Sequence, residues 1–179
     1  MPSQIMIIRH AEKPIPGRIR GVRQRGEIDE CSLSVRGWQR AGALVRFFLE
    51  PTVPDIRVPT QLIAAGFNRS EEGASRRSRQ TLIPLAHAMG ASIDDSLGKH
   101  QEKKAAERGL SHDGVVLFAW HHEHIPALAR AIAPAAAIPD PWPDDCFDRV
   151  WVFKPARGGA WYFEQIPQRL LAGDALAIG

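Results

Sequence analysis

The chain has 179 residues, of which 44% are hydrophobic and 24% are charged, so it can bury a core and does not have the composition of a disordered protein. The formal net charge of +3 is too small to predict nucleic-acid binding, and no apolar run approaches the roughly 20 residues that cross a bilayer. The two cysteines, Cys31 and Cys146, indicate neither a disulfide framework nor a zinc site. We therefore expect a single cytoplasmic domain over residues 1–179, without a metal, a cofactor, or a nucleic-acid or membrane partner. The sequence carries no signal for an oligomeric state.

Strands and helices alternate in the first half of the chain. Residues 5–8 form a continuous apolar run, which is typical of a strand buried on both faces. Residues 14–32 are rich in proline, glycine and charge, and predict a loop. Ser34 can cap a helix that ends before Pro51, with Trp38, Ala41, Val45 and Phe48 on its apolar face and Arg36, Gln39, Arg40 and Arg46 elsewhere. A second buried strand over 61–65 and a loop over 66–75 follow.

A further helix is expected from about Ser75 to Met89, with Gly90 ending it and Pro84 causing a bend or a later start. The remaining expected elements are, in order, a short strand over 91–94, an exposed helix over 100–108, a strand over 115–120, a helix over 125–133, a loop over 134–146, a hairpin of 149–153 with 160–165, and a final helix over 168–172.

This alternation predicts an α/β fold, a three-layer αβα sandwich whose mainly parallel sheet carries an antiparallel hairpin at one edge. Ligands of such sheets bind at the carboxyl ends of the strands. Arg9-His10 and His121-His122 both follow expected strands, so we expect them to face one crevice.

Phosphoryl transfer through histidine needs a neutral imidazole as nucleophile, cations for the phosphate oxygens, and a proton donor for the leaving group. Arginines gather in two segments, at positions 18, 20, 23 and 25 and at positions 69, 76, 77 and 79. Guanidinium groups bind phosphate oxygens in pairs, so the two segments fit an anionic ligand. Residues 17–25 are open to two interpretations: a flexible basic loop, which is the commoner outcome for such a segment, or a cover over the site that attracts an acidic substrate.

Four segments resemble the histidine phosphatase superfamily, the phosphoglycerate mutase-like proteins, in family order. Residues 8–14 (Ile-Arg-His-Ala-Glu-Lys-Pro) resemble the Arg-His signature in its Arg-His-Ala-Glu-Lys-Pro form. Residues 33–41 resemble the segment Leu-Thr-x-x-Gly-x-x-Gln-Ala, and residues 75–81 resemble Ser-x-x-Arg-Ala-x-x-Thr. Residues 115–125 resemble the last strand with its second histidine.

The resemblance implies a role for each matching residue. His10 is the expected nucleophile that becomes phosphohistidine, and Arg9 and Arg77 are expected to bind the phosphate, with Arg79 in reserve for Arg77. The second catalytic histidine is expected to be His122, with His121 as the alternative and as a substrate-binding residue.

The usual proton donor is missing from its place in the pattern. Lys99 stands where the family has a glutamate, so Glu102, Glu12 and Asp145 are the candidates, and Glu123 stands where glycine often follows the second histidine.

The resemblance implies a metal-independent phosphatase acting on a phosphorylated small molecule or a phosphoprotein. The alternatives are a phosphoglycerate-mutase-like phosphotransferase, which Lys99 disfavours, and a non-catalytic phosphate-binding regulatory module.

Overall fold

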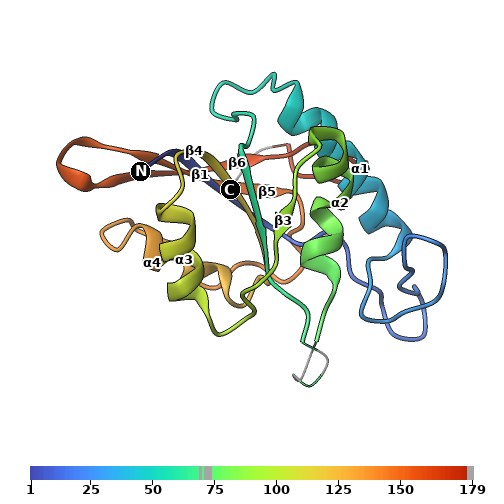
Figure 1. Ribbon diagram of the computed structural model, residues 1–179. Coiled ribbons are helices and arrows are strands. Elements are labelled where there is room, and N and C mark those ends of the chain that lie inside the picture. Colours follow the sequence, from blue (N-terminus) through green and yellow to red (C-terminus); the bar gives the residue numbers. More distant parts are fainter. Residues whose placement is uncertain (69, 71–73, 177–179) are drawn as a thin grey trace.

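A six-stranded mixed sheet forms the centre of the computed structural model, which describes residues 1–68, 70 and 74–176 (Figure 1). The strand order is β3-β2-β4-β1-β5-β6. Four strands are parallel, namely β1 (Pro2–Arg9), β2 (Gln61–Ala64), β3 (Ile93–Asp94) and β4 (Gly114–Trp120). An antiparallel hairpin completes one edge, with β5 (Arg149–Pro155) and β6 (Trp161–Pro167) joined through a 3-10 turn, η1 (Arg157–Gly159). The predicted fold class is confirmed.

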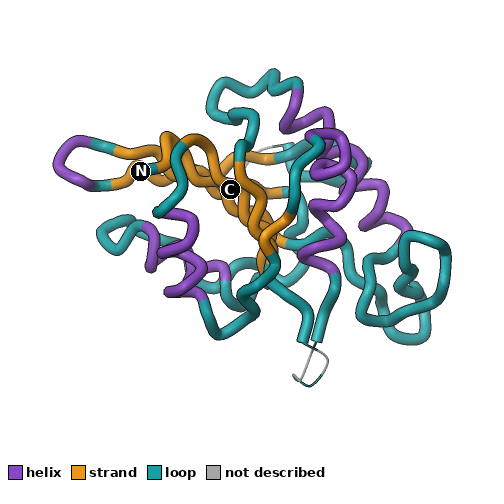
Figure 2. The backbone as a smooth tube through the Cα atoms, in the orientation of Figure 1, coloured by secondary structure: helices purple, strands orange, loops and turns teal. Residues whose placement is uncertain are grey.

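Two pairs of helices cover the two faces of this sheet (Figures 1 and 2). The pair α1 (Val35–Leu49) and α2 (Arg77–Met89) lies on one face, and the pair α3 (Glu102–Leu110) and α4 (Ile125–Ile132) lies on the other. Side chains of β1 alternate between them: Ile5 and Ile7 join the core under α3 and α4, while Met6 and Ile8 join the core under α1 and α2. This alternation is why the apolar run is continuous.

Helix α1 begins as predicted, because Ser34 Oγ accepts a hydrogen bond from the Gly37 amide at 3.1 Å. A Cβ at Gly37 would lie 2.5 Å from the Glu12 carbonyl oxygen, so glycine lets the helix start approach the segment that follows His10. The prediction placed Arg40 away from the apolar face. It is wrong for this residue, whose side chain is only 2% exposed.

Helix α2 starts at Arg77, two residues later than predicted, and continues through Pro84 to a left-handed Gly90. The expected loop over 66–75 lies partly outside the described residues, as does Arg69.

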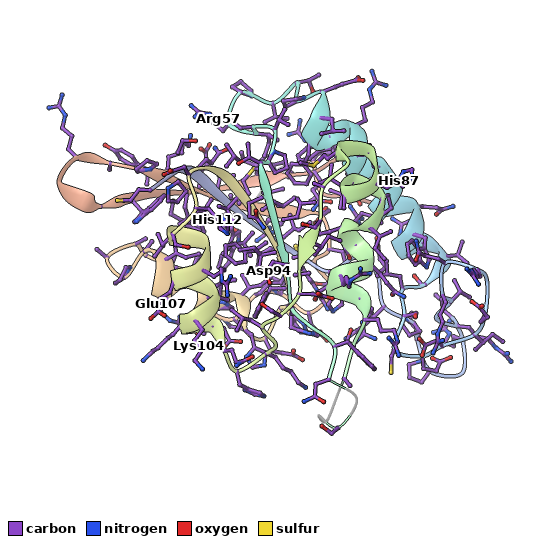
Figure 3. All side chains as sticks on the ribbon, in the orientation of Figure 1. Arg57, His87, Asp94, Lys104, Glu107 and His112 are labelled. Atoms are coloured by element: carbon purple, nitrogen blue, oxygen red, sulfur yellow. The ribbon has the colours of Figure 1, made fainter. Side chains whose placement is uncertain are left out.

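Two further expectations are corrected. Helix α3 is not exposed all round: Ala105 and Ala106 are buried, while Lys104 and Glu107 extend into solvent (Figure 3). Residues 168–172 form no helix, since Arg169 has a φ of 53° and the amides of residues 170 and 171 donate to the Asp174 carboxylate. Among the helices described, none has the length and apolar character needed to cross a membrane.

Candidate active site

The register of two neighbouring parallel strands brings two histidines together. Arg9 at the end of β1 pairs with Trp120 at the end of β4, and the His10 amide donates to the Trp120 carbonyl at 3.0 Å. The residue that follows β1 is His10, and the residue that follows β4 is His121, so the pairing of the two strands places these histidines side by side. Their ring centroids lie 5.7 Å apart with an interplanar angle of 77°.

His10 is held as a neutral imidazole with one defined tautomer. Its Nδ1 lies 2.8 Å from the Ala11 carbonyl oxygen, which can only accept, so Nδ1 carries the proton and the Nε2 lone pair is free. Burial, followed by the positive charge of Arg77 and the neighbouring His121, holds the pKa of His10 well below its usual 6.5. An unprotonated Nε2 is what a nucleophilic histidine requires.

The second histidine was expected to be His122, but the structure places His121 against His10. The ring contacts of His10 are with His121 and with Phe147, at 5.7 and 6.2 Å. His122 instead directs its Nε2 to the Asp144 carboxylate at 2.9 Å. Burial and then Arg77 lower the pKa of His121 to about 4, so this ring is neutral at pH 7 and carries one N–H donor.

Arg9 presents unused hydrogen-bond donors in a buried position. Its Nη1 donates to the Asp144 carbonyl at 2.5 Å, and its guanidinium carbon lies 3.9 Å from the centre of the Phe147 ring. Its Nε and Nη2 are buried without a hydrogen-bond partner among the described residues. Burial lowers the pKa of Arg9 to about 10, which leaves the group cationic at neutral pH.

Arg77 reaches the same site from the first turn of α2. Its Nη1 donates to the Glu30 carbonyl at 3.3 Å, while its buried Nε has no hydrogen-bond partner within the described part of the chain. Burial lowers its pKa as well. Thr81 ties this turn to the nucleophile, because its Oγ1 accepts from the Ala11 amide and donates to the Arg77 carbonyl, each at 2.8 Å.

The carboxylates expected as proton donors lie in other surroundings. Glu12 is ion-paired with Arg40 at 2.8 Å and Arg36 at 3.3 Å. Glu102 accepts from the Trp120 indole at 3.3 Å and lies 3.3 Å from His124 Nδ1.

Asp145, the third candidate, is exposed beside Glu12 on a small cavity of about 150 Å³.

Two carboxylates that the sequence analysis did not select lie at the site. Asp144 contacts His122, Lys13 at 3.5 Å and Arg9 Nη2 at 3.7 Å. Glu123 Oε2 lies 3.9 Å from His122 Nδ1, and its negative charge partly offsets the lowering of the pKa of Arg9, Arg77 and His121. Glu123 follows the histidine pair directly and was open to selection by position, whereas no local signal marks Asp144.

Lys99, the residue in place of the family glutamate, contributes positive charge near His121 and helps lower its pKa. Within the described ranges, no group of three or more His, Cys, Asp or Glu side chains has an arrangement that holds a metal ion.

No protein-family model and no curated protein matches the chain, but solved structures do. The protein histidine phosphatase SixA, in complex with tungstate, matches over 92% of this chain and 97% of its own, with 12% identity and a TM-score of 0.55. The Rv3214 protein of Mycobacterium tuberculosis matches over 90% of this chain and 95% of its own, with 14% identity and a TM-score of 0.48. The chain therefore has the histidine phosphatase fold, which confirms the resemblance at the level of structure.

Proposed function

We propose that this protein is a metal-independent phosphatase that forms a phosphohistidine intermediate on His10. The observation that carries the proposal is the buried, neutral His10, whose Nε2 lone pair is free beside His121 and the spare donors of Arg9 and Arg77. The fold supports a phosphorylated substrate, either a small molecule or a phosphoprotein.

The chemistry follows from these groups. His10 Nε2 attacks phosphorus, a P–N bond forms, and the P–O bond to the leaving group breaks. Arg9 and Arg77 donate to the non-bridging oxygens, and His121 adds its single N–H. Water then attacks phosphorus, the P–N bond breaks with its electron pair returning to Nε2, and inorganic phosphate leaves. We assign the second histidine to His121 because of its contact with His10, and we place His122 with Asp144 at the edge of the site.

The leaving oxygen still needs a proton, and Glu123 is the carboxyl group that faces the site from the strand end. Its side chain is 66% exposed and is not held in place beside a leaving group, so it is a poorly positioned acid catalyst. The enzyme should therefore prefer leaving groups that need little protonation. Among aryl phosphates, kcat/KM should rise steeply as the phenol becomes more acidic.

The decisive experiment measures turnover of p-nitrophenyl phosphate in EDTA and traps label from radioactive substrate on the protein. A label that is stable in base and lost in acid identifies phosphohistidine. His10→Gln should abolish both turnover and trapped label while circular dichroism stays unchanged, and His121→Gln should reduce turnover more than His122→Gln. The matched control is His100→Gln, because His100 belongs to a second T-shaped histidine pair, with His124, at 4.7 Å.

Full activity in His10→Gln would overturn the proposal. Phosphate binding without turnover in the wild-type protein would favour the non-catalytic binding module. The exposed side chains of Glu123 and Asp144 are consistent with that alternative, because neither is a well-placed proton donor. Transfer of the label to a sugar acid rather than to water would favour the mutase-like alternative.

A further inference from the structure

A second basic cavity lies beside the phosphate pocket, between the loop at residues 23–27 and helix α2. Its volume is about 610 Å³. Four arginines line it, at positions 23, 25, 76 and 79, together with Phe67 and Asp95 among others. A volume of this size lies within the roughly 300–1,000 Å³ of typical ligand sites, so the cavity accommodates several side chains rather than a single small anion.

Positive charge exceeds negative charge in this lining. Arg79 is paired with Asp95 at 2.9 Å, and Arg23 and Arg76 share the Asp29 carboxylate at 3.1 and 3.4 Å. Arg25 makes no side-chain hydrogen bond or ion pair with any described residue and is exposed. Glu27 also lines the cavity, so three carboxylates, of Glu27, Asp29 and Asp95, stand against four guanidinium groups. The remaining positive charge leaves the cavity suited to additional carboxylates.

An aromatic ring fixes the orientation of one of these arginines. The Arg76 guanidinium lies 3.9 Å from the centre of the Phe67 ring. Stacking on the ring covers one face of the guanidinium and leaves its edge for hydrogen bonds, the geometry that binds a carboxylate in a bidentate way.

The cavity and the phosphate pocket share one wall. Residues 29–31 carry the Asp29 carboxylate toward the cavity arginines, while the Glu30 carbonyl accepts from Arg77, the expected phosphate ligand. The Cys31 carbonyl accepts a hydrogen bond from the Arg76 amide at 2.9 Å, which connects residues 29–31 to the start of α2. Arg76 and Arg77 are consecutive, one lining the cavity and the other at the candidate active site.

We infer that this cavity binds an acidic peptide segment next to the phosphorylated residue of a protein substrate. The inference rests on the proposed function and narrows its substrate class to phosphoproteins with acidic flanks. The phosphate enters beside His10 and Arg77, and aspartate or glutamate side chains a few residues away pair with Arg25 and the Phe67-stacked Arg76. In this binding mode, the loop at residues 17–25 attracts the acidic substrate through Arg23 and Arg25.

The test uses two phosphotyrosine peptides that differ only in their flanks, with Asp and Glu in one and Asn and Gln in the other. The leaving phenol is the same in both, so any difference in kcat/KM reports the flanks. We expect the wild-type protein to prefer the acidic peptide by about fivefold to tenfold, the size of one or two exposed ion pairs. Arg25→Glu should remove most of this preference, and Arg25→Gln should remove part of it.

Turnover of p-nitrophenyl phosphate should be unchanged in both variants, because Arg25 is not part of the site at His10. The matched control is Arg157→Glu, an exposed arginine in the hairpin turn at the other end of the sheet. It makes the same change in charge and should keep the preference for acidic flanks.

A second readout keeps this inference separate from the proposed activity. Fluorescence anisotropy of the unphosphorylated peptides should show tighter binding of the acidic one, with a dissociation constant that rises in Arg25→Glu and with added salt. This binding is expected even if the protein proves to have no phosphatase activity. Equal binding of both peptides, or an acidic preference that Arg25→Glu leaves intact, would overturn the inference.

Discussion

Arg9 and Arg40 are both almost fully buried, at 1% and 2% exposure, but their partners differ. Arg40 Nη2 lies 2.8 Å from Glu12 and 2.7 Å from Asp174, and its Nη1 donates to Gln168 at 2.9 Å. Arg9 donates from Nη1 to backbone carbonyls, and its Nη2 lies 3.7 Å from the exposed Asp144 carboxylate. Its Nε and Nη2 have no hydrogen-bond partner among the described residues. Both side chains lose their hydration as buried cations. Arg40 is compensated by two largely buried carboxylates at hydrogen-bond distance, whereas the Asp144 carboxylate near Arg9 is exposed and lies farther away.

The pKa values follow this difference. Burial by itself would lower the pKa of Arg40, but Asp174 and Glu12 raise it above its ordinary value. At Arg9, burial outweighs the nearby negative charges and lowers the pKa to about 10. A buried cation with spare donors and a lowered pKa is a site prepared for an anion from outside, whereas a fully paired one holds the fold together.

The largest effect is expected from Arg40→Met. It would leave Asp174 buried without its cation and Glu12 with Arg36 as its remaining ion-pair partner, so the free energy of unfolding should fall by about 3–5 kcal/mol in urea denaturation. Arg46→Met on the same helix is the control, because that side chain is 85% exposed, and it should change stability by less than about 0.5 kcal/mol. Adding Asp174→Asn to Arg40→Met should recover part of the loss. A neutral outcome for Arg40→Met would remove the distinction between the two arginines.

Arg77→Met should show the opposite behaviour. Its Nε, like that of Arg9, is buried and unpartnered, so removing the cation should cost little stability. Loss of an oxyanion donor should lower kcat/KM for p-nitrophenyl phosphate by about 10²–10³-fold, measured by steady-state kinetics. Arg79→Met is the matched control, since Arg79 is half exposed and paired with Asp95, and it should retain most activity. An equal loss in both variants would contradict the assignment of Arg77.

The smallest expected effect is a difference between the candidate site and the Arg40 cluster in how each makes the free energy of unfolding depend on pH. His121 has a pKa of about 4 in the folded chain and an ordinary value of 6.5, so between these values the unfolded chain binds the extra proton. The free energy of unfolding should therefore fall by roughly 3 kcal/mol at most as pH drops from 6.5 to 4, and His10, also lowered, adds to this window.

Asp174 acts in a lower window. Burial would raise its pKa, but the hydrogen bond from Arg40 and the backbone amides of Leu171 and Leu170 lower it to about 2 from 3.8, and its side chain is 5% exposed. Its contribution of about 2 kcal/mol is present above pH 3.8 and is lost as pH falls toward 2. In denaturation curves taken across pH, His121→Asn should reduce the pH dependence only in the upper window, where the part due to His10 remains, and Asp174→Asn should reduce it only in the lower window. Identical pH profiles for the two variants would show that the regions titrate together.

The sequence predicted helices and strands correctly where their hydrophobic residues follow a clear helical or strand pattern. The run at residues 5–8, the strand before His121 and the capped helix after Ser34 were all predicted, because each alternation or cap acts over a few residues. The predicted helix over 168–172 failed because the Asp174 side chain binds the backbone amides of residues 170 and 171. Arg40 was misplaced for a similar reason, since its partners lie 28 and 134 residues away.

The sequence by itself determined the layered α/β architecture and marked Arg9, His10, Arg77 and a histidine pair as the candidate site. Only the tertiary structure decided that His121 lies against His10, because this depends on the register of β1 with β4. It also placed Asp144 against Arg9 and His122, Glu12 against Arg40, and Glu102 against Trp120. Helix and strand periodicity depends on neighbouring residues and can be read from the sequence, whereas the partner of a buried charge depends on how distant segments pack.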